Sequence, residues 1–78
     1  MLFDSELEND RPPHEQLSDR EFDIMRRLVT GMGINEIAGE LSISNKTVST
    51  HKARLMQKMG FTSNADMIRY AVRYGLVE

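Results

Sequence analysis

Between residues 45 and 60 the chain carries four positive side chains and no negative one: Lys46, Lys52, Arg54 and Lys58. Lysine and arginine neutralise nucleic-acid phosphates, and a cationic helix face is the electrostatic footprint of such binding. The whole chain has a net charge of −2, so this positive charge is local. The segment therefore predicts a phosphate-binding surface rather than a generally basic protein.

The same segment has the periodicity of an amphipathic helix. On a projection of 100° per residue, Leu55 and Met59 fall within about 20° of Val48 and form the predicted core stripe. The opposite side gathers positive charge and small side chains that can contact bases or phosphates: Lys46, Ser49, Thr50, Ala53, Arg54 and Gln57. The simpler alternative is a solvated helix face, but such a face usually mixes Glu with Lys.

The N-terminal segment has the opposite charge. Residues 1–17 contain five acidic residues and one arginine, which gives −4, whereas residues 18–78 carry +2. Residues 1–16 include Pro12-Pro13 and show no sustained periodicity, so we expect an acidic linker or tail, followed by one domain over residues 17–78. Within the tail, three apolar residues could form a short docking element, although the composition favours a disordered remnant: Leu2, Phe3 and Leu7.

Capping signals divide the domain into short helices. Ser18 and Glu21 match a capping box that opens a helix to about residue 29, with Gly31 just after its end. Asn35 is expected to cap a second helix, from residue 36 to about residue 41. After the turn at residues 42–44, Ser44 is expected to cap the helix over residues 45–59, which ends at Gly60.

The last helix is expected to run from residue 64 to about residue 74, opened by a second capping box at Ser63 and Asp66. Its inward residues are predicted to be Ala65, Ile68, Ala71, Val72 and Leu76. Its outer surface is then formed by Met67, Arg69 and Tyr70. No segment has strand periodicity, so the fold class is all-α, a four-helix bundle that contains a helix-turn-helix.

Other chemistry has little support. Cysteine is absent, which excludes disulfides and thiolate zinc sites. His14 lies in the tail and His51 lies at the core boundary, where a packed and hydrogen-bonded histidine is expected, so we predict no metal and no cofactor. No residues form a catalytic triad or a phosphate loop, so an enzyme is not expected. No apolar run is long enough to span a membrane, and we expect a soluble cytoplasmic protein without a membrane partner.

The residues from Leu17 to Leu76 resemble the LuxR/FixJ/NarL-type four-helix DNA-binding domain along its full length. The matching elements are Leu17-Ser18-x-Arg20-Glu21, Glu36-Ile37-Ala38, Leu41-x-Ile43-Ser44, Lys46-Thr47-Val48-x-x-His51, Lys58-Met59-Gly60 and Arg73-x-Gly75-Leu76. Several spaced elements in the right order form a far more specific signal than a single motif. SNKTVST followed by ARLMQKM is most similar to the branch of BvgA/EvgA-like response regulators.

This resemblance implies that the helix over residues 45–59 enters the DNA major groove and that the last helix forms a two-fold dimer contact. The family positions that contact DNA correspond to Lys46, Thr47, Ser49, Thr50, Ala53 and Lys58. The chain departs from the family at Ser49 and Ala53, where several relatives carry basic residues, so the base preferences of those relatives do not carry over. Lys52 and Arg54 can replace part of that charge.

We therefore predict a sequence-specific DNA-binding domain of a bacterial transcriptional regulator, acting on double-stranded DNA as a homodimer. Its dimer contacts are expected at Met67, Arg69 and Tyr70. If the chain is a fragment, an upstream receiver domain would make it the effector part of a two-component response regulator. If it is complete, it is a stand-alone regulator. Two alternatives are a protein-interaction module that uses the last helix or the N-terminal tail, and a small enzyme.

Overall fold

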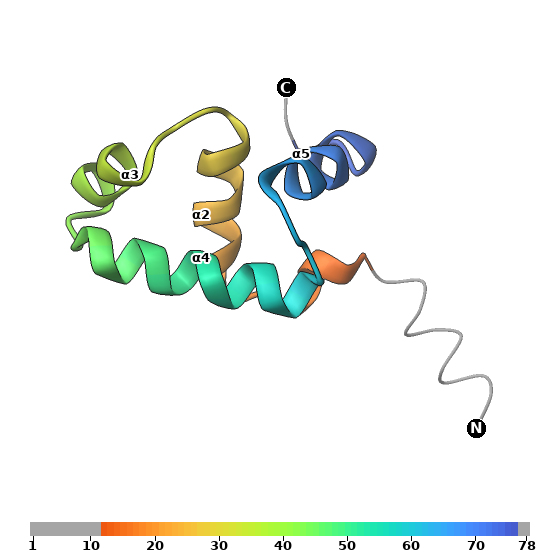
Figure 1. The fold of residues 1–78 in the computed structure, drawn as a ribbon, viewed down its shortest axis with the longest axis horizontal. Coiled ribbons are helices and arrows are strands. Elements are labelled where there is room, and N and C mark those ends of the chain that lie inside the picture. The colour runs from red at the N-terminus through yellow and green to blue at the C-terminus, as the bar shows by residue number, and fades with distance from the viewer. Residues whose placement is uncertain (1–11, 77–78) are drawn as a thin grey trace.

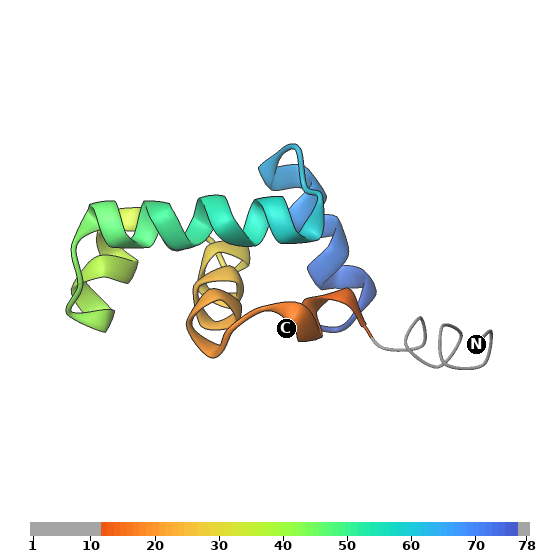
Figure 2. The same ribbon diagram turned by 90° about the horizontal axis from the view of Figure 1, so that it is seen from below.

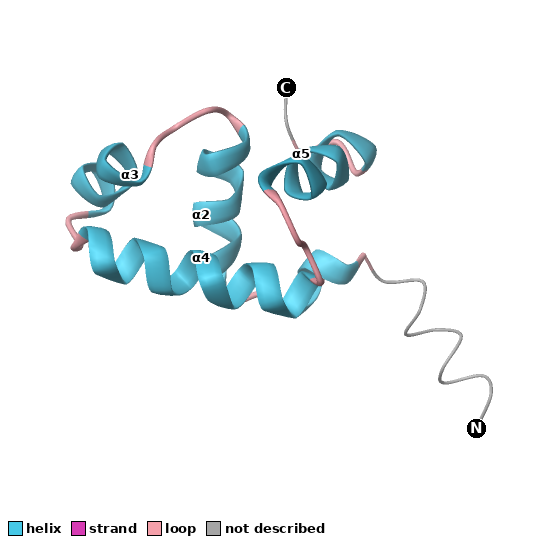
Figure 3. Ribbon diagram, in the orientation of Figure 1, coloured by secondary structure: helices cyan, strands magenta, loops and turns pink. Residues whose placement is uncertain are grey.

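The computed structural model describes residues 12–76 of the chain. Over this range the elements are a short 3-10 helix, η1 (Pro13–Gln16), and the α-helices α2 (Asp19–Val29), α3 (Ile34–Leu41), α4 (Asn45–Met59) and α5 (Asn64–Arg73). This described part of the chain contains no β-strand (Figure 3). The prediction of an all-α fold is confirmed. The docking element suggested in the tail lies outside the described residues.

The longest helix, α4, is the element on which the others pack. Figure 1 shows α2 crossing α4 steeply, with α3 near the N-terminal end of α4 and α5 near its C-terminal end. Both α2 and α3 contact α4, and α5 contacts α2. The largest fully buried side chains come from all four α-helices: Ile24, Met25, Ile37, Val48, Leu55 and Met67. The core therefore packs against one side of α4, and the opposite side of this helix is exposed to solvent.

A tight turn joins α3 to α4. Ser42 adopts a left-handed conformation, with φ of 58°, and ends α3. The backbone N–H of Ile43 donates to the carbonyl of Ala38 at 3.0 Å, which returns the Ile43 side chain to the core. The hydroxyl of Ser44 accepts the backbone N–H of Thr47 at 3.0 Å and caps α4. The predicted helix-turn-helix and its N-cap are confirmed.

The helix starts agree with the sequence analysis at α2 but not at α3. Ser18 and Glu21 form the predicted capping box, with contacts of 3.1 Å and 2.9 Å. The Glu36 carboxylate accepts the backbone N–H of Gly33 at 2.9 Å, so α3 begins at Ile34, two residues earlier than predicted. The N-cap prediction at Asn35 was wrong, because its side chain instead accepts a hydrogen bond from the Asn45 amide in the first turn of α4.

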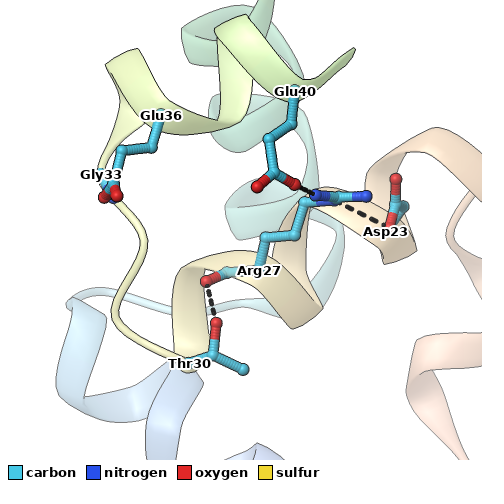
Figure 4. A network of polar contacts seen from close by, with 6 residues as sticks. All are labelled: Asp23, Arg27, Thr30, Gly33, Glu36 and Glu40. Carbon is cyan, nitrogen blue, oxygen red and sulfur yellow. Dashed lines mark hydrogen bonds and ion pairs between the residues drawn. The ribbon is translucent and has the colours of Figure 1, made fainter.

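A charged network fixes α3 against α2. Figure 4 shows Arg27 of α2 between two carboxylates, at 3.1 Å from Asp23 on its own helix and in an ion pair with Glu40 of α3. The Thr30 hydroxyl donates to the carbonyl of Arg27 at 2.7 Å at the end of α2. This network holds the first helix of the helix-turn-helix in place on the scaffold.

The predicted capping box at the start of α5 is only half formed. The Ser63 hydroxyl accepts the backbone N–H of Asp66 at 3.2 Å, as expected. The Asp66 carboxylate instead accepts the backbone N–H and the hydroxyl of Thr62, at 2.8 Å and 2.7 Å. These two hydrogen bonds are the main reason why the pKa of Asp66 is lowered. The loop before α5 is therefore tied to the helix one residue earlier than the motif predicts.

The predicted inner face of α5 was partly wrong. Met67 is buried at 2% exposure, although it was expected on the outer surface. Ile68 and Val72 are 46% and 63% exposed, although they were expected in the core, and Ala65 is exposed as well. The predictions for Ala71, which is buried, and for Leu76, which packs against the core, are confirmed. The last helix thus turns a different side to α2 than its sequence suggested.

Candidate nucleic-acid interface

The side of α4 that faces away from the core contains the residues predicted to contact DNA. Seven of the eight predicted positions are exposed: Lys46, Thr47, Ser49, Thr50, Ala53, Arg54 and Lys58. The eighth, Lys52, is half-buried, as expected for its place near the core stripe. Val48 and Leu55 of that stripe are fully buried, whereas Met59 is only half-buried. The face predicted from the helix period is therefore the face that is accessible.

Three of the four positive side chains of α4 keep their charge unpaired within the described residues. Over residues 12–76, no carboxylate lies within ion-pair distance of Lys46, Lys52 or Arg54. Lys58 is different, because its ammonium lies 2.8 Å from the Glu21 carboxylate of α2. The cationic surface is thus strongest over the N-terminal and middle turns of α4 and weaker at its C-terminal end.

The pair between Glu21 and Lys58 links α2 to α4. The side chain of Glu21 is 5% exposed and that of Lys58 is 42% exposed, so the carboxylate is buried and the ammonium reaches solvent. The hydrogen bond from Lys58 is the main cause of the lowered pKa of Glu21, the backbone N–H of Ser18 adds to it, and burial opposes it. The sequence predicted Lys58 among the DNA-contacting residues but gave no indication of Glu21 as its partner. It lies 37 residues away, beyond any local sequence signal.

The threonine hydroxyls on α4 have defined orientations. Thr50 donates its hydroxyl to the carbonyl of Lys46 at 3.0 Å, one helical turn earlier. The Thr47 hydroxyl lies 2.9 Å from the hydroxyl of Ser44 at the helix cap. Since the Thr50 hydrogen is used inside the helix, the oxygen offers its lone pairs outward. Thr50 is therefore suited to accept a hydrogen bond, for example from the amino group of adenine or cytosine.

His51 lies half-buried at the edge of the core. Its Nδ1 atom is buried and has no hydrogen-bond partner among the described residues, so the expectation of a hydrogen-bonded histidine was wrong. A proton on Nδ1 would be a buried donor without an acceptor, which is costly. The tautomer with its proton on Nε2 avoids this cost. His51 does not lie in a group of metal ligands within the described residues.

Residues just before α2 contact the C-terminal half of the molecule. The Tyr70 hydroxyl accepts the backbone N–H of His14 at 2.9 Å and lies 2.8 Å from the Nδ1 atom of the same residue. The Gln16 side chain donates to the carbonyl of Lys58 at 2.9 Å, near the end of α4. Both residues belong to the segment predicted from the sequence to be a linker or tail. Contacts across 56 and 42 residues leave no local pattern by which they could have been found.

The predicted dimer surface on α5 has a different composition. A shallow groove of about 600 Å³ runs along α5, and its lining residues are Phe61, Asp66, Ile68, Arg69, Tyr70, Val72 and Arg73. Arg69 is exposed and Tyr70 half-buried, whereas Met67 lies in the core. Ile68 and Val72 take its place as the large exposed apolar residues of this helix.

Among the described helices, none is long and apolar enough to cross a membrane.

Comparison with known proteins assigns this arrangement to a family. The family model described as "Bacterial regulatory proteins, luxR family" matches residues 15–71, which is more than half of the chain. The chain belongs to the luxR family of bacterial regulatory proteins. The matched range covers α2, α3 and α4 completely and most of α5. No solved structure gives a significant match to this luxR-family chain.

Several curated relatives support the luxR-family assignment. Fimbriae Z protein of Escherichia coli (strain K12) is 48% identical over 61 residues, which cover 78% of this chain and 29% of the relative. The DNA-binding transcriptional activator EvgA of the same strain is 41% identical over 71 residues, covering 91% of this chain and 35% of EvgA. Oxygen regulatory protein NreC of Staphylococcus aureus (strain JH9) is 39% identical over 70 residues, 90% of this chain and 32% of NreC. The chain spans about a third of the length of these relatives.

Proposed function

We propose that this protein binds double-stranded DNA in a sequence-specific way and regulates transcription, with α4 as the helix that enters the major groove. The observation that carries the proposal is the exposed face of α4, which is positively charged and free of acidic residues. The major groove is wide enough to admit an α-helix, and its base edges are distinguishable there. The luxR-family assignment and the similarity to the DNA-binding transcriptional activator EvgA support the same function.

Different residues of α4 are proposed to contact phosphates and to contact bases. Lys46 and Thr47 lie at the exposed N-terminal end, and Lys52 at the edge of the core, where they can hold phosphates and fix the register. The four exposed residues proposed to read base edges are Ser49, Thr50, Ala53 and Arg54. Lys58 would contact a phosphate at the other end, although its charge is shared with Glu21. We therefore expect a weaker electrostatic contribution from Lys58 than from Lys46.

A salt titration with matched arginine variants tests this proposal. A preferred sequence is first selected from a random DNA pool, and its affinity is measured at several salt concentrations. Arg54→Ala removes a charge from α4, and Arg26→Ala removes the same charge from an exposed position on α2. We expect Arg54→Ala to lower the affinity and to reduce the salt slope by about one, and Arg26→Ala to leave both unchanged. Equal behaviour of the two variants, or no selected sequence, would contradict α4 as the DNA-binding helix and favour a protein-interaction module.

We further propose that two copies pair on DNA through α5, each copy on one half-site. The exposed apolar residues Ile68 and Val72 line the groove on α5 together with Arg69 and Tyr70. This patch is small, and interfaces below about 1,200 Å² are usually weak or transient. Two adjacent half-sites would hold the copies together and raise their effective concentration. Sedimentation is expected to show a monomer alone and two copies on a paired site, and a stable dimer without DNA would contradict this.

The same relatives suggest the context in which the domain works. We propose that it is the effector part of a two-component response regulator and is joined in the whole protein to a receiver domain. The chain matches only about a third of EvgA and NreC, so the remainder of such a protein has room for a separate signal-receiving domain. Sequencing the natural gene around residue 1 tests this directly. An open reading frame without a receiver domain would contradict it.

A further inference from the structure

The short 3-10 helix η1 contacts both α4, the proposed DNA-binding helix, and α5, the helix proposed to pair with a second copy. Figure 1 shows η1, in orange, beside the C-terminal end of α4, and Figure 2 shows the same turn beside α5. Its two hydrogen-bonding side chains point to different helices, because Gln16 binds the Lys58 carbonyl of α4 and His14 binds the Tyr70 hydroxyl of α5. One short turn therefore bridges the two helices.

An aromatic cluster supports the contact to α5. The ring of His14 stacks on Phe22 of α2, with centroids 5.3 Å apart and an interplanar angle of 20°. It also meets Tyr70 and Tyr74 edge-on, at 5.7 Å and 6.0 Å. Burial raises the pKa of the Tyr70 hydroxyl, which keeps the phenol neutral over the physiological range. His14 is thus enclosed by rings from two helices and is hydrogen-bonded to one of them.

The contact of Gln16 with α4 satisfies a backbone carbonyl that has no hydrogen-bond partner within the helix. The last four carbonyls of an α-helix have no partner within the helix, and Lys58 is the residue before the last of α4. Gln16 supplies the missing donor at 2.9 Å and also lies 3.9 Å from the Met59 sulfur. Direct packing of α5 is mainly on α2, so the turn adds a second support for its position relative to α4.

We propose that η1 is a clasp that sets the position of α5 against α4, and that His14 and Gln16 are positioning residues for DNA binding by two copies. This inference rests on the proposed function, in which α4 contacts DNA and α5 contacts the second copy. Two α4 helices must enter major grooves about one helical turn apart, so the angle between α4 and α5 fixes whether both fit. A loosened clasp would leave each copy able to bind a half-site but would impair the pair.

The test uses variants of the 78-residue chain that each remove the contacts of one side chain. Tyr70→Phe removes the hydroxyl that His14 binds and keeps the ring, and Tyr74→Phe, at the exposed residue just after α5, is its control. Gln16→Ala removes the donor to the Lys58 carbonyl, and Glu15→Ala changes the exposed neighbour in the same turn. Amide hydrogen exchange of residues 64–73 is measured without DNA, and affinity is measured on paired and single half-sites.

We expect faster exchange in α5 for Tyr70→Phe and Gln16→Ala, with no change in the two controls. Combining Tyr70→Phe with Gln16→Ala removes the hydrogen bonds of both side chains and should lower the affinity for a paired site by at least about tenfold, with little change on a single half-site. Unchanged exchange in α5 would overturn the clasp. Equal loss on both DNAs would overturn its role in pairing. Failure of the proposed function is seen separately, as absence of any selected DNA site for the parent chain.

Discussion

The helices α4 and α5 differ in how their apolar residues are arranged around the helix axis. In α4 the largest apolar side chains gather on one side, with Val48, Leu55 and Met59 in a narrow stripe and Met56 beside it, and most other positions are polar. The helix α5 has two apolar pairs, and the two members of each pair lie about one turn apart. Met67 pairs with Ala71, and Ile68 pairs with Val72. Consecutive residues differ by about 100° around a helix, so both pairs cannot face the core centrally. A single stripe determines the buried face, whereas two stripes leave the choice to packing.

The aromatic residues explain which stripe of α5 is buried. Tyr70 and Tyr74 lie on the Met67 side of the helix, where they meet His14 and Phe61. Turning Met67 inward buries it and brings both rings against their partners. Turning Ile68 inward would expose the rings and leave His14 without its hydroxyl partner. The position of η1, which is distant in sequence, therefore helps to select the face of α5.

The largest expected effect separates Met67 from its neighbour. Met67→Glu would place a carboxylate in the core, at a residue that is 2% exposed, and should remove most of the roughly 5–15 kcal/mol of stability typical of a small domain. Ile68→Glu changes a residue that is 46% exposed and should leave the fold intact while weakening paired-site binding. Thermal unfolding followed by circular dichroism measures the first effect, and binding to paired and single half-sites measures the second. Similar melting of Met67→Glu and the parent would restore the original assignment of the outer face.

A smaller effect concerns the buried carboxylate under α4. Glu21→Gln should cost about 2 kcal/mol, because it weakens both the cap on Ser18 and the ion pair with Lys58. The pKa of Glu21 is lowered in the folded state, so its contribution is present above the ordinary carboxyl pKa and is lost as pH falls through the folded value. Urea unfolding at neutral and acidic pH should show a smaller loss of stability on acidification in Glu21→Gln than in the parent. The same acid dependence in both proteins would count against this role of Glu21.

Two lysines of α4 should respond differently to the same substitution. Lys46→Ala is expected to lower affinity for all DNA sequences and to reduce the salt slope by about one, with little effect on folding. Lys58→Ala should reduce the slope by less and should also lower the unfolding midpoint, because it leaves Glu21 without its partner. Salt titration and urea unfolding of the two variants give both quantities. Identical results for Lys46→Ala and Lys58→Ala would show that the ion pair has no influence in solution.

The smallest expected effect lies in base preference. Thr50→Val removes an outward acceptor without changing charge, so it should alter selectivity at one base position by about 1 kcal/mol or less. Ala53→Lys introduces a basic residue on the same exposed face and should change the preferred sequence as well. Selection from a random DNA pool compares the motifs preferred by the parent protein and by the two variants. Recovery of one common motif would show that these two residues do not face the bases.

Local patterns were sufficient for most of the fold. The capping residues Ser18 and Ser44, the boundaries of α4 and its exposed face depend on contacts within about four residues, and such contacts are written directly in the sequence. The start of α3 was missed although its contact is local, because Gly33 has no side chain to cap the helix and only the Glu36 carboxylate, three residues later, marks the start. The error is small because it moves the helix start and leaves its buried face, with Ile37 and Ala38, unchanged.

The sequence by itself determined the four helices, the helix-turn-helix and the cationic face of α4, because each depends on neighbours along the chain. Only the tertiary structure decided which face of α5 is buried, that Lys58 shares its charge with Glu21, and that η1 joins α4 to α5. These features depend on contacts across 37, 42 and 56 residues. Such contacts depend on how closely the helices pack against one another. The periodicity of a single helix carries no information about the spacing between helices.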